Sequence, residues 1–153
     1  MTILALDLGT KLGWALRYSA SEIYHGTQSF ERKGSDGAGM RFLKFRQWLK
    51  KLAEEHGPIE AIYYEDVRAH KGVAAAHIYG GLKGVLMAWA EERGIPYAGV
   101  TVQDIKHAAT GKKNAGKAQM IAAMEAKGFE PEDDNAADAL ALLLCVQAER
   151  EAA

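Results

Sequence analysis

The first fifteen residues, MTILALDLGTKLGWA, constrain the fold more than any other stretch of this chain. The apolar run ILAL has the length of a short strand and ends at Asp7; Gly9 and Gly13 bracket an expected tight turn, and a second strand starts at Trp14. This pattern predicts a β-hairpin. A carboxylate at the end of a buried strand needs a partner, because burying an unpaired charge is costly. Aspartate is also a common turn residue, so position alone leaves Asp7 as either a turn former or a site residue.

Length and composition favour one globular domain spanning residues 1–153, with 48% hydrophobic and 25% charged residues. The longest apolar run, Ala139 to Val146, is too short to span a bilayer. No basic region precedes an apolar one at the N-terminus, so we expect neither secretion nor a membrane partner. The single cysteine, Cys145, has no partner for an internal disulfide. These features indicate a reducing, cytoplasmic location.

The charges are unevenly distributed although the net charge is only −1. Residues 32–51 are basic with Asp36 as their single acid, residues 105–124 contain lysines and no acid, and acids gather at residues 130–138. A basic surface beside an acidic site suits a metal-dependent enzyme acting on a phosphate polymer. Each cluster by itself is equally typical of a solvated helix face.

Hydrophobic periodicity predicts five strands and five helices. The expected strands are Thr2–Asp7, Gly13–Tyr18, Ile23–Phe30, Ile59–Glu65 and Tyr97–Val102. The expected helices are Met40–His56, Val73–Arg93, Gln103–Ala109, Ala115–Lys127 and Asp134–Arg150. Three strands in hairpin order, followed by alternating helices and strands, predict an α/β fold with a mixed sheet and helices on its faces.

Three carboxylates stand where such a fold places its sites. Glu65, like Asp7, ends an apolar strand, and the two meet at one edge if their strands are parallel neighbours. Asp138 lies in the first turns of the last helix, and Asn135 and Asp134, three and four residues earlier, share its face.

Converging carboxylates repel one another, and a divalent cation relieves the repulsion. Ligand sets made only of oxygen select Mg²⁺ or Mn²⁺ over zinc. With Asp7 bridging, such a set could hold two ions about 3.5–4 Å apart, the arrangement used for attack of water on a phosphodiester. Each residue also has a purely structural interpretation: a turn for Asp7, a solvated strand end for Glu65, and a helix cap for Asp133 or Asp134.

Four segments together resemble RuvC-type Holliday junction resolvases, and look most like the phage-encoded or prophage branch. They are LALDLGT (residues 4–10), GWA (13–15), YEDV (64–67) and NAADALA (135–141). The resemblance runs over essentially the whole chain. It implies a ribonuclease H-like fold with a five-stranded mixed β-sheet flanked by α-helices, a homodimer, a bacterial cell, and nicking of branched DNA with two Mg²⁺ ions per subunit, for which Mn²⁺ can substitute. By matching position, Asp7, Glu65 and Asp138 become metal ligands and catalytic residues.

The segments VQDIK (102–106) and AGKAQ (115–119) resemble the basic stretch of the same family. The resemblance suggests that Lys106 and Lys117 contact the DNA backbone or the scissile phosphate, with Lys117 stabilising charge on the phosphorane. Lys112 and Lys113, in the glycine-containing loop between these segments, are then phosphate contacts that do not read sequence.

The chain departs from the family pattern at two positions. Asn135 stands where the family commonly has Asp or His; its amide can ligate Mg²⁺ but supplies no charge, so Asp134 is the alternative ligand. Arg68 stands where the bacterial resolvases have an aromatic residue that stacks at the junction centre. An arginine can also stack on a base, and with His70 and Lys71 it is expected to contact DNA; a solvated loop is the other interpretation.

Several alternatives stay open at this point. The small residues of the helix Val73–Arg93 fit either dimer contacts or close packing on the sheet. The segment DLGTKLG also resembles the first phosphate motif of the actin and sugar-kinase superfamily, but the chain is too short for the second half that superfamily needs. The main hypothesis is a metal-dependent, structure-selective endonuclease that nicks Holliday junctions, flaps or forks. The alternatives are an RNA-processing nuclease of the same fold and a catalytically weak junction-binding protein.

Overall fold

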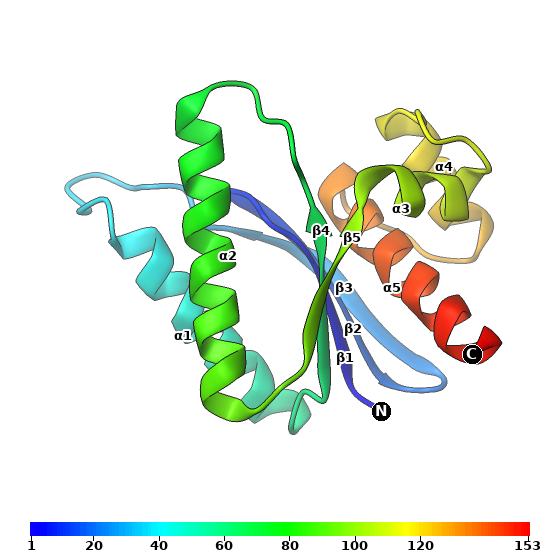
Figure 1. Ribbon diagram of the computed structural model, residues 1–153, viewed down its shortest axis with the longest axis horizontal. Helices are drawn as coiled ribbons and strands as arrows, with labels where there is room; N and C mark the ends of the chain where they lie inside the picture. The colour runs from blue at the N-terminus through cyan, green and yellow to red at the C-terminus, as the bar shows by residue number, and fades with distance from the viewer.

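The computed structural model covers residues 1–153 and contains a five-stranded sheet between two layers of helices (Figure 1). The strands are β1 Ile3–Asp7, β2 Lys11–Ser19, β3 Glu22–Ser29, β4 Ala61–Asp66 and β5 Tyr97–Thr101. The helices are α1 Met40–His56, α2 Val73–Arg93, α3 Val102–Thr110, α4 Lys117–Ala126 and α5 Asp134–Ala152. The strand order is β3-β2-β1-β4-β5; β1 pairs antiparallel with β2 and parallel with β4. The predicted α/β fold with a mixed five-stranded sheet is therefore confirmed.

The first hairpin differs from the sequence-based expectation. Gly13 lies inside β2, directly opposite Asp7, and does not bound the turn. Pairing of β2 with β3 extends as far as Lys11 opposite Ser29, which keeps the residues before Gly13 in the strand. The turn itself is confined to the residues around Gly9. The other elements start or end within a few residues of the prediction, and α1 and α2 coincide with it.

Side chains of β1 alternate between two separate hydrophobic clusters. Leu4 and Leu6 join the cluster on the α1 and α2 side, whereas Ile3 and Ala5 join the cluster on the α5 side. Both faces of the strand are buried, which explains why its sequence is a continuous apolar run. The same alternation directs Asp7 toward the α5 side.

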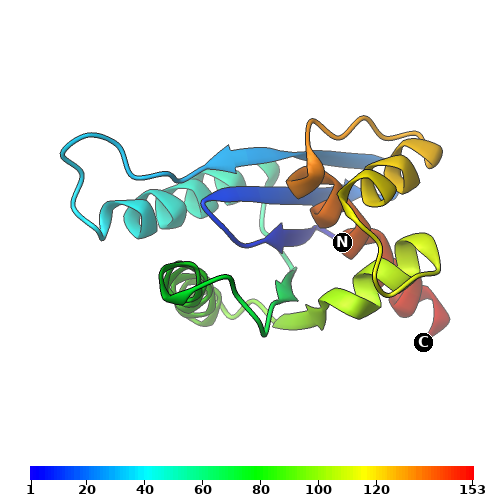
Figure 2. The ribbon, with the colours of Figure 1, turned by 90° about the horizontal axis from the view of Figure 1, so that it is seen from above.

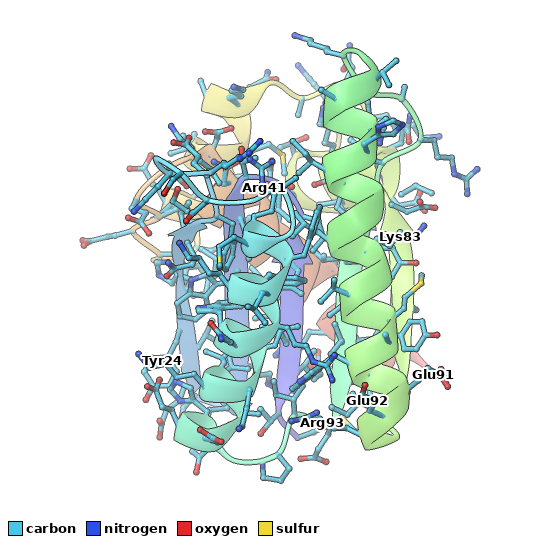
Figure 3. The ribbon with its side chains drawn as sticks, turned by 90° about the vertical axis from the view of Figure 1, so that its left-hand side faces the viewer. Tyr24, Arg41, Lys83, Glu91, Glu92 and Arg93 are labelled. Atoms are coloured by element: carbon cyan, nitrogen blue, oxygen red, sulfur yellow. The ribbon has the colours of Figure 1, made fainter.

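Helices α1 and α2 lie side by side over one face of the sheet (Figure 3). They touch where a glycine makes room: a side chain at Gly81 of α2 would overlap the ring of Phe42 in α1. Gly80 and Gly84 have nothing within 4 Å of the place a Cβ would occupy. The small-residue face of α2 is therefore divided between packing on α1 and open surface. None of the helices combines the length and apolar character needed to cross a bilayer.

Helix α5 covers the opposite face together with α3 and α4, while the loop between β3 and α1 extends away at the far end of the molecule (Figure 2). The first half of α5 is rich in buried alanine, including Ala136, Ala137 and Ala139. Ala137 and Ala139 belong to the same cluster as Ala5 and Ala15, so the helix lies close to the sheet. The position of its first turn decides where Asp138 lies.

Candidate active site

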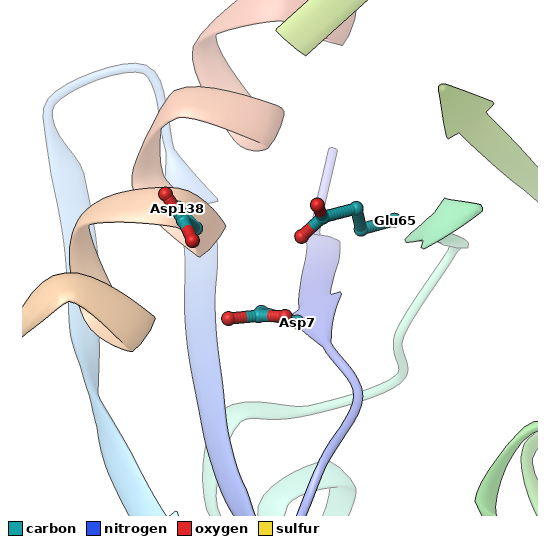
Figure 4. Close-up of side chains that lie close together, drawn as sticks. All are labelled: Asp7, Glu65 and Asp138. Carbon is teal, nitrogen blue, oxygen red and sulfur yellow. The ribbon is translucent and has the colours of Figure 1, made fainter. Parts of the chain in front are cut away.

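Three carboxylates converge at the end of β1. Asp7 comes from the end of β1, Glu65 from β4 and Asp138 from the second turn of α5, and their side chains face one another (Figure 4). One oxygen of each lies within 4.8 Å of the others. The convergence expected from the sequence is confirmed, and the donor set is made of hard oxygen ligands suited to a divalent cation.

Register and alternation explain why the first two carboxylates meet. The parallel pairing of β1 with β4 sets Leu6 opposite Tyr64. The next positions along both strands are Asp7 and Glu65. Both follow residues whose side chains face the opposite cluster, so both point toward α5. Two strand ends and one helix start thus supply the site, at the carboxyl edge where parallel sheets bind ligands.

The electrostatics of the group favour a bound proton or cation. Burial raises the pKa of Asp7 well above its usual value, and the charges of Glu65 and Asp138 raise it further. Burial also raises the pKa of Glu65, opposed by its hydrogen bond with Asp7 and by the charge of Lys106. For Asp138, burial raises the pKa to about 7, with Glu65 contributing in the same direction. A divalent cation would remove the cause of these shifts by neutralising the carboxylates.

The two other predicted ligands lie at the start of α5, one turn before Asp138. Asp134 is partly buried, and its charge raises the pKa of both Asp7 and Asp138, but its carboxylate lies outside the close group of three. Asn135 is partly buried with its backbone against Gly13. Asp133, and not Asp134, caps the helix: its Oδ1 accepts from the Ala136 N–H at 2.9 Å.

The predicted lysines differ in exposure and in their effect on the carboxylates. Lys106, on α3, is partly buried and lowers the pKa of both Glu65 and Asp138. Lys117, at the start of α4, is exposed, with its Nζ 3.7 Å from Asp134 Oδ2, and it lowers the pKa of Asp138. The charge of Lys106, which the sequence suggested for DNA contact, therefore acts on two of the three acids. Lys112 and Lys113 are exposed in the loop between α3 and α4.

The loop after β4 carries the three residues expected to contact DNA, of which Arg68 matches the junction-centre position. Arg68 is exposed, and its Nε lies 3.3 Å from Asp66 Oδ2. His70 is partly buried against Tyr79, with ring centroids 4.7 Å apart, and Lys71 is exposed. The loop therefore presents two cationic side chains, those of Arg68 and Lys71, to solvent shortly after Glu65 in the chain.

Sequence reasoning missed Tyr79, which holds the loop after Glu65 in place. Its hydroxyl donates to the Glu65 carbonyl at 2.8 Å and accepts from the Val67 N–H at 3.1 Å. Tyr79 sits on the buried face of α2, so the periodicity of α2 identifies it only as a core residue. No local signal indicates that its hydroxyl reaches a neighbouring element.

Sequence comparisons with known proteins converge on one family. The sequence model of a family described as "Crossover junction endodeoxyribonuclease RuvC" matches residues 3–146. The protein of that name from Trichlorobacter lovleyi is 30% identical over 151 residues, which cover 95% of this chain and 84% of that protein. The one from Ruegeria pomeroyi is 28% identical over 149 residues, covering 95% and 90%.

Solved structures share the fold. T. thermophilus RuvC in complex with Holliday junction substrate superposes with a TM-score of 0.81 and 21% identity, covering 99% of this chain and 96% of that one. The yeast mitochondrial Holliday junction resolvase superposes with a TM-score of 0.67 and 16% identity, covering 98% and 80%. The shared fold therefore extends over nearly the whole of this chain.

Proposed function

Because this chain belongs to the RuvC family of crossover junction endodeoxyribonucleases, we propose that it hydrolyses phosphodiester bonds in branched DNA with the help of divalent cations. The observation that carries the proposal is the group formed by Asp7, Glu65 and Asp138, with one oxygen of each within 4.8 Å of the others. The substrate is a Holliday junction, with flaps and forks as related branched forms. The chain acts as one nuclease domain over residues 1–153.

The three carboxylates and one further oxygen donor are proposed to hold two Mg²⁺ ions, with Mn²⁺ able to substitute. Asp7 interacts with both Glu65 and Asp138, which suits it to bridge the ions. Asp134 or Asn135 completes the set from the first turn of α5. When bound, the ions lower the pKa of the attacking water and neutralise charge that develops on the phosphate.

Two lysines are proposed to act on the scissile phosphate. The charge of Lys106 lowers the pKa of both Glu65 and Asp138, so it can also attract a phosphate that the carboxylates alone would repel. Lys117 is the second cation, and on cleavage it stabilises charge on the phosphorane. Exposed Lys112 and Lys113 contact the DNA backbone on the same side, since flexible ammonium groups bind phosphates without reading sequence.

The loop after Glu65 is proposed to contact the junction centre. Arg68 is exposed and planar, so it can stack on an unpaired base. His70 and Lys71 follow within the same loop, and Lys71 is exposed.

A homodimer is proposed to form through α2. Gly80 and Gly84 lie four residues apart on an open part of its surface, where another backbone can approach closely. A twofold dimer would carry two sites for paired cuts in two strands. Sedimentation of the purified protein tests the dimer directly.

The deciding experiment is cleavage of a labelled synthetic four-way DNA junction with Mg²⁺, beside linear duplex and a four-way RNA junction. We expect symmetric paired nicks on the DNA junction, none with EDTA and none with Asp7→Asn. Junction binding by Asp7→Asn should be intact or tighter, because the substitution removes negative charge near phosphate. Cleavage by Asp7→Asn at the wild-type rate would refute the site assignment.

The same experiment separates the alternatives. Preference for the RNA junction would indicate an RNA-processing nuclease of this fold. Binding without cutting, in Mn²⁺ as well as Mg²⁺, would indicate a junction-binding protein in which Asn135 fails to support the second ion.

A further inference from the structure

Three residues on neighbouring strands form a row that leads from the site to the edge of the sheet. In the strand register, Asp7 of β1 faces Gly13 of β2, and Gly13 faces Thr27 of β3. The segment that starts α5 lies across this row. It touches Gly13 through Asn135 and Thr27 through Glu132 and Asp133.

Gly13 acts as the point of closest approach between β2 and α5. A Cβ added there would overlap the carbonyl of Asn135 and lie 3.0 Å from the nitrogen of Ala136. Both are backbone atoms of the first helical turn, so neither can rotate away as a flexible side chain would. Gly13 is not among the glycines with positive φ, so space and not backbone conformation requires glycine here. Any larger residue would push the start of α5 away from the sheet.

Thr27 ties the same turn to β3 through polar contacts. Its backbone N–H donates to Glu132 Oε1, and its hydroxyl donates to Asp133 Oδ1 at 2.6 Å. The same Oδ1 accepts from the Ala136 N–H at 2.9 Å, so one oxygen both caps the helix and fastens it to the sheet. A steric stop at Gly13 and a tie at Thr27 together define the position of the turn.

We infer that Gly13 and Thr27 are positioning residues for the metal site, which set how closely Asp138 on α5 approaches Asp7 on β1. Asp138 follows Asn135 by three residues within one rigid helix, so it moves with the turn that Gly13 and Thr27 hold. Asp138 contributes one of three carboxylate oxygens that lie within 4.8 Å of one another, so a shift of this turn would change the size of the group. The inference rests on the proposed function in taking the three carboxylates as metal ligands.

The test compares three single substitutions by direct Mn²⁺ binding, read from the electron paramagnetic resonance signal of the free ion. Thr27→Val keeps the shape and the backbone N–H but removes the hydroxyl, and we expect Mn²⁺ affinity to fall about tenfold, as loss of an outer partner typically does. Thr27→Ser retains the hydroxyl and should restore the affinity. Leu52→Val is the matched control, because Leu52 is buried in the cluster on the other face of the sheet. It should lower the melting temperature without changing Mn²⁺ affinity.

Cleavage provides a second readout. Thr27→Val should need a higher Mg²⁺ concentration for half-maximal rate, while its affinity for the junction in EDTA stays that of the wild type. Under conditions in which the Gly13→Ala variant is folded, it should show the same defect more strongly. Wild-type Mn²⁺ affinity in folded Thr27→Val, or an equal loss in Leu52→Val, would overturn the inference. If the wild type binds Mn²⁺ but leaves the junction uncut, the proposed function fails while the positioning role is still decided by the Mn²⁺ titrations.

Discussion

Replacing Asp138 with asparagine should stabilise the protein at about pH 8 in EDTA while abolishing cleavage. Asparagine has nearly the same shape but carries no charge. In the folded protein, burial and the neighbouring charges of Glu65 and Asp134 raise the pKa of Asp138 from 3.8 to about 7. Ionising this carboxyl therefore costs the folded state more than the unfolded chain, and the substitution removes that cost.

The sign and size of this change in the free energy of unfolding follow from the linkage between proton binding and folding. Between the ordinary pKa of Asp138 and its raised folded value, the folded protein keeps a proton that the unfolded chain has released. The free energy of unfolding therefore falls as the pH rises through this range. At about 1.4 kcal/mol per pKa unit, the cost is roughly 1.7 kcal/mol at pH 5 and roughly 4.3 kcal/mol at pH 8. The gain from Asp138→Asn should thus be larger at the higher pH by about 2.5 kcal/mol.

Urea unfolding in EDTA at both pH values measures this difference. Glu54→Gln is the control, because Glu54 is an exposed carboxylate on α1, remote from the group; it should change the free energy of unfolding by less than about 0.5 kcal/mol at either pH. Mg²⁺ should stabilise the wild type more than the variant, since a ligand stabilises the state that binds it. A gain at pH 8 no larger than at pH 5 would refute the idea that Asp138 is destabilised by ionisation within a carboxylate cluster.

Two further predictions concern residues around the carboxylates. Lys106→Ala removes a charge that lowers the pKa of Glu65 and Asp138, so both carboxyls should hold their protons to higher pH. The acid limb of the pH–rate profile in Mg²⁺ should therefore move to higher pH. An unchanged acid limb would show that the charge of Lys106 does not act on these acids. Tyr79→Phe removes the hydroxyl that binds the Glu65 carbonyl and the Val67 N–H, and should cost about 1–3 kcal/mol in urea unfolding and slow cleavage. Unfolding energy equal to that of the wild type would contradict the role given to that hydroxyl.

Much of the fold follows from local pattern. The apolar run before Asp7, the helical spacing in α1 and the glycine that ends α2 are all readable within a few neighbouring residues. The three carboxylates could be found the same way, because each stands at an element boundary next to a buried run. The sequence did not show where the second strand of the hairpin begins. Gly13 resembles a turn glycine, and only the pairing of β2 with β3 shows that it lies inside a strand.

The sequence by itself determined which side chains are candidates for the metal site and for the core, and on which face of its own helix or strand each one lies. Tertiary structure alone decided which of them meet. Parallel pairing of β1 with β4 brings Asp7 to Glu65, and the packing of α5 on Gly13 brings Asp138 to both. On the opposite face of the sheet, the packing of α2 on α1 brings Gly81 against the ring of Phe42. The physical reason is that backbone propensity and amphipathic spacing act over a few residues, whereas register and close approach depend on atoms far apart in the chain.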